Sequence, residues 1–114
     1  MTKAYQNQLT LLLAELDLDL NPDIELQVKS FFGGAAAYAN GHICLSLTKV
    51  GFAVKLPQVD REELLNIGAR PLRYFPKAPV KKQYVILPDR IMYEPSDLRK
   101  WVRKSILFVT VQEK

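Results

Sequence analysis

The side chains best suited to covalent chemistry are one cysteine and one histidine, each the only residue of its type in the 114-residue chain. Cys44 and His42 are two positions apart, so on a β-strand both would project from the same face. A thiol beside an imidazole can act as a nucleophile with its general base. The sequence supplies no third group to orient this pair, and a small cysteine on a sheet face beside a turn accounts for both residues without catalysis. We expect no catalytic residues and no enzyme activity, with a small-molecule or enzymatic site near His42 and Cys44 as an alternative.

Two other patterns that can hold ions or phosphates are incomplete. A calcium loop needs carboxylates at fixed spacing around a glycine. The acidic run of Asp17, Asp19, Asp23 and Glu25 is interrupted by leucine and proline and contains no glycine. Gly33-Gly34 lacks the following lysine and hydroxyl residue of a phosphate-binding loop. The sequence therefore predicts neither a metal ion nor a cofactor.

The segment from position 70 to position 82 combines basic and aromatic side chains. Cations can follow a phosphate backbone while aromatic rings stack on bases. A hairpin whose alternate residues face solvent gives the same composition, so both interpretations remain open. The residues are Arg70, Arg73, Tyr74, Phe75, Lys77, Lys81 and Lys82. A second basic set on the outer face of the last helix can extend this surface and consists of Arg99, Lys100, Arg103 and Lys104.

Charge is unevenly distributed along the chain, whose formal net charge is +4. Residues 1–48 carry two lysines and five acidic groups, whereas residues 49–114 carry fourteen basic and seven acidic groups. The basic second part favours an acidic partner, either protein or nucleic acid. A single cysteine excludes an intrachain disulfide and a cysteine-rich zinc site.

The chain has the size and composition of one cytoplasmic domain, expected to span residues 1–114. Its 48% apolar content is ordinary for a globular protein of this length. The longest uncharged stretch, 30–48, is broken by glycine and asparagine, so we expect no membrane span. The N-terminus lacks the basic and apolar regions of a signal peptide.

Hydrophobic spacing predicts a helix and then a strand at the start of the chain. Apolar residues from Tyr5 to Leu16 recur at helical intervals, and Pro22 follows this segment. Alternation begins at Ile24 and predicts a strand that continues through Gly33-Gly34 to Tyr38. Paired glycines inside a strand indicate a bulge or the close approach of another backbone.

Asn40-Gly41 is the strongest hairpin signal, because a type I′ turn needs positive φ at both central positions. The returning strand is expected to alternate between two faces, with a second turn at 49–51 and a further strand over 52–56. One face would carry Ile43, Leu45 and Leu47, and the other Cys44, Ser46 and Thr48.

The second half reads as a short helix, a hairpin and a final helix. Asp60 is expected to cap a helix over 61–67, which ends at Gly68. The runs 72–75 and 83–87 predict one more hairpin. Ser96 is expected to cap the last helix, whose buried stripe would be Leu98, Trp101, Val102, Ser105, Ile106 and Val109.

These elements predict an α+β fold. Its antiparallel sheet would have about five strands, with an N-terminal helix, a short middle helix and a C-terminal helix packed on one face.

Several landmarks occur together in the order and spacing of a known family. They are Phe32-Gly33-Gly34, Tyr38, Asn40-Gly41, Val54-Lys55-Leu56, Gly68-Ala69, Tyr84, Leu87-Pro88, Pro95, Leu98 and Trp101. With these residues, over positions 24–106, the chain resembles the TfoX N-terminal domain family. It departs from the family at Ser30-Phe31, where arginine and methionine are common, and in an alanine where the family has a glycine before the tyrosine.

The resemblance implies a regulatory domain without catalytic residues. In competence regulators such as TfoX and Sxy it forms the N-terminal half, and those proteins resemble transcriptional co-activators that act with the cyclic-AMP receptor protein. Their second, helix-hairpin-helix-like domain is not expected within these 114 residues.

The leading hypothesis is therefore a non-enzymatic module that docks on a protein partner, with the transcription machinery as its expected source. Direct nucleic-acid binding through the 70–82 hairpin and the last helix is the second hypothesis. A homodimer is also compatible with the sequence, because small sheet domains can pair through exposed edges.

Overall fold

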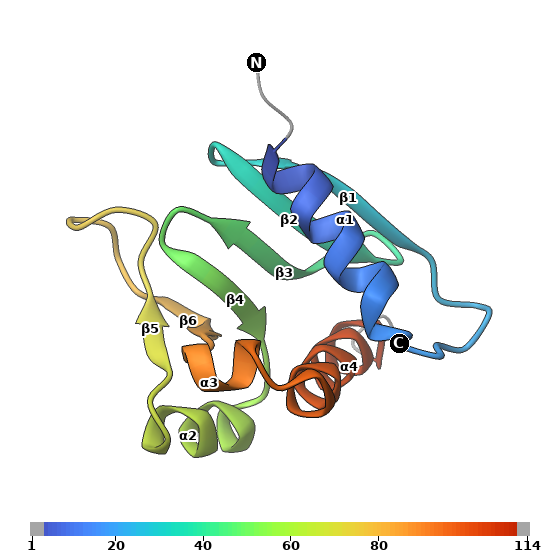
Figure 1. Cartoon of the computed structure of the whole chain (residues 1–114). Coiled ribbons are helices and arrows are strands. Elements are labelled where there is room, and N and C mark those ends of the chain that lie inside the picture. Colours follow the sequence, from blue (N-terminus) through green and yellow to red (C-terminus); the bar gives the residue numbers. More distant parts are fainter. Residues whose placement is uncertain (1–3, 112–114) are drawn as a thin grey trace.

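Helices cover one face of an antiparallel sheet in the computed structural model, which describes residues 4–111 (Figure 1). The helices are α1 (Ala4–Leu16), α2 (Gln58–Asn66), α3 (Asp89–Met92) and α4 (Pro95–Val111). The strands are β1 (Leu26–Phe31), β2 (Gly34–Ala39), β3 (His42–Thr48), β4 (Gly51–Lys55), β5 (Arg70–Leu72) and β6 (Lys81–Ile86). Their order across the sheet is β1-β2-β3-β4-β6-β5. The predicted α+β class is confirmed.

One row of cross-strand partners faces the helices and contributes to the main core. It runs from Val28 through Ala37, Leu45 and Val54 to Val85. Side chains from all four helices pack into the same core, as the alternation of a half-covered sheet requires. The buried stripe of α4 consists of the predicted residues, Leu98, Trp101, Val102, Ser105, Ile106 and Val109.

The neighbouring row faces the other side of the sheet and has small residues at its centre. From β1 to β5 its members are Lys29, Ala36, Ser46, Ala53, Ile86 and Arg70. The three central side chains are fully buried although no helix of the described chain packs on them. Ala53 belongs to a small cluster with Leu72 and Ile86, against which Tyr74 of the β5–β6 loop packs, and the Tyr74 hydroxyl also reaches the Ser46 hydroxyl. Small side chains thus leave room for this loop against the sheet.

The sheet has six strands, so the expectation of about five was wrong. The strand predicted from Ile24 to Tyr38 is divided by a turn at Phe32-Gly33. Phe32 has φ of 46° and Gly33 has φ of 77°, which are the left-handed angles of a tight hairpin turn. A bulky residue adopts such angles rarely, and for that reason local sequence did not reveal the turn.

Gly34 meets the second expectation for the glycine pair, a close approach of another backbone. A Cβ built on Gly34 would lie 2.3 Å from the carbonyl oxygen of Leu47 on β3. Only glycine therefore lets β2 and β3 approach as they do.

Helix boundaries differ from the predicted caps. The second helix begins at Gln58 with no side-chain cap, so Asp60 lies in its first turn instead. The last helix begins at Pro95, which suits a first helical position, and Ser96 donates to the Glu94 carboxylate. The short helix α3 was not predicted at all.

The assignment of Cys44 to the face opposite Leu45 was wrong. The register shifts between Ala37, which pairs with Leu45, and Tyr38, which pairs with Ile43. Cys44 is the extra residue of this bulge, and both it and Leu45 belong to the main core. A bulge lets two successive side chains point to the same side.

Candidate functional site

Three segments from different parts of the sequence meet on the sheet face that the helices leave open. They are the β1–β2 turn, the β3–β4 turn and the β5–β6 loop, which all lie at the upper left of Figure 1. We call the region where these segments meet, together with Arg70 of β5, the three-turn surface. Its members are Phe31, Phe32, Lys49, Val50, Arg70, Arg73, Tyr74, Phe75 and Pro76.

Three aromatic rings form a contiguous cluster at one side of the three-turn surface. The Tyr74 ring centroid lies 5.5 Å from that of Phe31 and 5.0 Å from that of Phe32. Phe31 and Phe32 meet edge to face at 4.7 Å. The Tyr74 hydroxyl also forms a 3.2 Å hydrogen bond with Ser46 Oγ, so the cluster is held against the sheet. Phe32 nevertheless remains 67% exposed.

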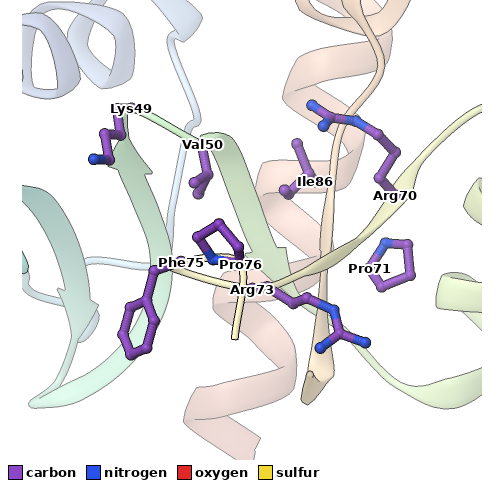
Figure 2. Close-up of a pocket in the computed structure, with 8 residues that line it drawn as sticks. All are labelled: Lys49, Val50, Arg70, Pro71, Arg73, Phe75, Pro76 and Ile86. Carbon is purple, nitrogen blue, oxygen red and sulfur yellow. The ribbon is translucent and has the colours of Figure 1, made fainter. Parts of the chain in front are cut away.

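Beside the rings is a hollow of about 590 Å³ with an apolar floor and a basic rim. Figure 2 shows Val50, Pro76 and Ile86 between Lys49 on one side and Arg70 on the other. The residues lining it are Lys49, Val50, Arg70, Pro71, Arg73, Phe75, Pro76 and Ile86. Its charged lining is thus entirely cationic.

Arg73 has a positioning function at this hollow. Its Nη1 donates a 2.8 Å hydrogen bond to the carbonyl oxygen of Ala78, at the far side of the β5–β6 loop. A guanidinium that bonds across a loop limits the conformations of that loop, and Ala78 is itself buried. Phe75, which is 56% exposed, is therefore presented from a closed loop.

The sheet as a whole carries no carboxylate side chain. Neither aspartate nor glutamate occurs in residues 26–59 or 64–88, and these two ranges contain all six strands. The cations of the same ranges are Lys29, Lys49, Lys55, Arg70, Arg73, Lys77, Lys81 and Lys82. Among residues 4–111 the acidic side chains lie in the helices, in their flanks and in the α1–β1 loop, so the net charge of +4 understates the positive charge of the sheet.

Tyrosines on the open face add no negative charge to it. Burial raises the pKa of Tyr74, while its hydrogen bond with Ser46 acts in the opposite direction. The pKa of Tyr84 is raised well above 10.0, first by burial and then by the nearby Tyr74 phenol. Both phenols are therefore neutral at physiological pH.

The basic residues predicted from the hairpin and those predicted from the last helix do not form one patch. Lys77 is exposed in the β5–β6 loop and Lys81 and Lys82 are exposed at the start of β6, where Lys82 lines a separate hollow next to α2. In contrast, α4 lies in the helix layer, far from the β5–β6 loop in Figure 1. Arg99 and Lys100 are exposed there.

Several cations of α4 have structural contacts. The Arg103 guanidinium donates to the carbonyl oxygens of Leu18 and Asp19, the latter at 3.0 Å, and so joins α4 to the chain after α1. Lys100 Nζ lies 4.6 Å from the centroid of the buried Trp101 ring. The sequence did not distinguish these cations from binding residues.

Cys44 has the properties of a core residue. Its side chain is fully buried, and its Sγ–H donates to the carbonyl oxygen of Ala37 at 3.5 Å. Burial raises the pKa of the thiol to about 12, so it is protonated at neutral pH and unsuited to nucleophilic attack. His42 is exposed at the start of β3. The alternative of a site built on this pair gains no support from their positions.

Several of the residues that carry the family resemblance have structural functions, at the β2–β3 turn and elsewhere. Asn40 and Gly41 have φ of 51° and 86°, which confirms the type I′ turn signal. The Asn40 side-chain oxygen accepts a 2.8 Å hydrogen bond from the Glu25 backbone N–H. Lys29 Nζ lies 5.1 Å from the Tyr38 ring centroid, and Gly68 has φ of 114° after α2.

A second concave region lies between helices on the other side of the molecule. The groove has a volume of about 340 Å³. Its lining is mostly apolar and consists of Gln8, Leu11, Leu12, Glu15, Leu16, Met92, Pro95 and Leu98. Leu11 is 59% exposed within it. We call this region the α1–α3–α4 groove.

Over residues 4–111 the structure contains no helix long and apolar enough to cross a membrane. The same residues contain no group of three or more histidine, cysteine or carboxylate side chains that could hold a metal ion.

Comparison with known families gives one match, which covers most of the chain. The family described as the TfoX N-terminal domain matches residues 20–109. A comparison with curated proteins found no match. The match includes all six strands, α2, α3 and most of α4, and therefore every residue of the three-turn surface.

Proposed function

The chain belongs to the TfoX N-terminal domain family, and on that basis we propose that it is a non-enzymatic regulatory module that docks on a protein partner. The partner would belong to the transcription machinery, in a cytoplasmic setting. The observation that supports docking is the α1–α3–α4 groove, with its apolar lining and the exposed Leu11.

Exposed apolar residues in a groove are the usual anchor points of protein interfaces. Leu11 and Leu12 of α1 lie opposite Met92 and Leu98, so a partner side chain can contact two helices at once. Anchors that fill such a groove supply most of the binding energy at an interface. An amphipathic helix in a groove is one common way in which this geometry is used.

The charge at the groove indicates which kind of partner segment would bind there. Glu15 is the one charged residue among those that line the groove. A segment with apolar side chains and a basic flank complements this surface, because opposite charges steer association and disfavour wrong partners.

The test is affinity capture from native lysate with wild-type protein, the Leu11→Glu variant and the Leu107→Glu variant. Leu107 is 45% exposed on α4 and does not line the groove, so its substitution is a matched control for added charge on a helix. We expect a captured protein to be lost with Leu11→Glu and retained with Leu107→Glu. Equal capture by all three proteins, or no capture under gentle conditions, contradicts docking at the groove.

A further inference from the structure

We infer that the three-turn surface binds single-stranded nucleic acid, with a phosphate at the basic rim of the hollow and bases on the exposed rings. This surface is on the open face of the sheet, whereas the groove of the proposed function is in the helix layer (Figure 1). The two proposals therefore concern different surfaces and can be tested independently.

The first support is electrostatic. A carboxylate beside a phosphate site would repel the ligand, and residues 26–59 and 64–88 contain none. Lys49 and Arg70 are exposed and lie on opposite sides of the hollow in Figure 2, so cations are available on both sides of a bound phosphate. Arg73 adds a third cation and is oriented by its bond to Ala78. Release of counterions from the nucleic acid then favours binding.

The second support is the presentation of aromatic rings next to those cations. Phe32 and Phe75 are 67% and 56% exposed, an unusual state for phenylalanine in a folded domain. Phe32 also holds a left-handed backbone conformation, which costs free energy and is found most often where function requires it. A base stacked on such a ring contributes about 1–3 kcal/mol.

The third support concerns the form of the nucleic acid. Reading duplex DNA in its major groove normally requires a protruding helix or a two-stranded ribbon. On the long cationic helix α4, Arg103 donates hydrogen bonds to backbone carbonyl oxygens and Lys104 forms an ion pair with Asp60. Both side chains therefore already have partners within the protein. The three-turn surface is instead concave and its rings are accessible, which suits unpaired bases. A hollow of about 590 Å³ falls in the size range of small-molecule binding pockets.

The experiment is fluorescence anisotropy of labelled oligo-dT, about twelve nucleotides long, titrated with the 114-residue chain across a salt series. With two to three phosphates neutralised, log Kd should rise with log salt concentration with a slope of about 1.4–2.1. The same sequence as a duplex should bind at least about fivefold more weakly, because stacking on the rings is then lost.

Matched variants separate the site from overall charge. Arg70→Glu and Arg99→Glu change the net charge equally, and both arginines are exposed. Arg70→Glu should weaken binding about tenfold, whereas Arg99→Glu should change it less than about twofold. Phe75→Leu keeps an apolar side chain but removes the ring, and should weaken binding about fivefold. Thermal melting of each variant confirms that it is folded.

Three outcomes would overturn the inference. The first is no binding at low salt, and the second is equal weakening by Arg70→Glu and Arg99→Glu. The third is complete displacement of oligo-dT by polyglutamate at equal charge concentration, which would assign the surface to an acidic protein instead. None of these results bears on capture through Leu11, so failure here leaves the proposed function intact.

Discussion

The rings of Phe32 and Tyr74 lie 5.0 Å apart and join the turn between β1 and β2 to the loop between β5 and β6. In the strand order β1-β2-β3-β4-β6-β5, the pair β1–β2 is at one end of the sheet and the pair β6–β5 is at the other. The contact is possible because small side chains at Ala36, Ser46 and Ala53 allow the loop to lie on the open face. Stability and the candidate binding surface therefore depend on the same aromatic cluster.

The hydrogen bond of Tyr74 can be separated from its ring by two substitutions. Tyr74→Phe should lower the free energy of unfolding by about 1 kcal/mol, because Ser46 Oγ loses its partner in a buried position. Tyr74→Ala should cost about 2 kcal/mol or more, since ring contacts and apolar burial are lost as well. Urea unfolding measures both. Equal losses for the two variants would show that the rings contribute nothing.

Substitution of Phe32 should weaken binding while leaving stability nearly unchanged. Phe32→Gly removes a left-handed strain of about 1–2 kcal/mol but also ring contacts of about 0.5–1.5 kcal/mol. The free energy of unfolding should therefore change by less than about 1 kcal/mol. Binding of oligo-dT should nevertheless weaken about fivefold. A large loss of stability would mean that the turn itself needs phenylalanine.

Gly34 and Gly41 offer a matched pair of glycine substitutions. Gly34→Ala should cost about 3 kcal/mol or prevent folding, because the new Cβ would lie 2.3 Å from Leu47 O. Gly41→Ala meets no atom within 4 Å and should cost only the left-handed strain, about 1 kcal/mol. Chemical unfolding compares the two. Similar costs would contradict the close approach of β3 to Gly34.

Arg103 is expected to stabilise the fold rather than bind a ligand. Arg103→Ala removes the bonds to Leu18 O and Asp19 O and should cost about 2 kcal/mol, whereas Arg99→Ala should stay within about 0.5 kcal/mol. Oligo-dT affinity of the folded Arg103→Ala protein should be unchanged. A loss of oligo-dT affinity without a loss of stability would show that Arg103 belongs to the binding surface.

Stability should fall at alkaline pH because of Cys44. Its thiol pKa is raised from 9.0 to about 12 in the folded protein, so the folded state retains the proton more strongly than the unfolded state. The resulting stabilisation is complete below pH 9.0 and is lost as pH rises towards 12. Urea unfolding should show a loss of about 1.4 kcal/mol per pH unit in this range for this group.

A conservative variant checks that assignment. Cys44→Val lacks a titrating group at this position and should have a shallower alkaline loss than the wild type, with tyrosines such as Tyr84 still contributing. An identical pH profile for the two proteins would show that the thiol is not the source.

The sequence by itself determined the fold class, the type I′ turn at Asn40-Gly41, the buried stripe of α4 and the family. These features depend on local spacing and on residues with special backbone preferences, which are visible along the chain. The segregation of carboxylates away from residues 26–59 and 64–88 was equally visible in the sequence. Only the structure shows that these ranges contain the whole sheet, and therefore that the sheet carries no carboxylate.

Tertiary structure alone decided three features. The turn at Phe32-Gly33 raised the strand count to six because contacts with Tyr74 help to hold a phenylalanine at an angle that local preference disfavours. The bulge at Cys44 placed this residue on the same face as Leu45, through an irregular register between β2 and β3. Finally, the structure separated the cations of α4, held by Leu18, Asp19 and Trp101, from those around the hollow. The contacts of Phe32 with Tyr74 and of Arg103 with Leu18 and Asp19 join residues far apart in the chain, and the bulge depends on a strand register that side-chain alternation does not encode.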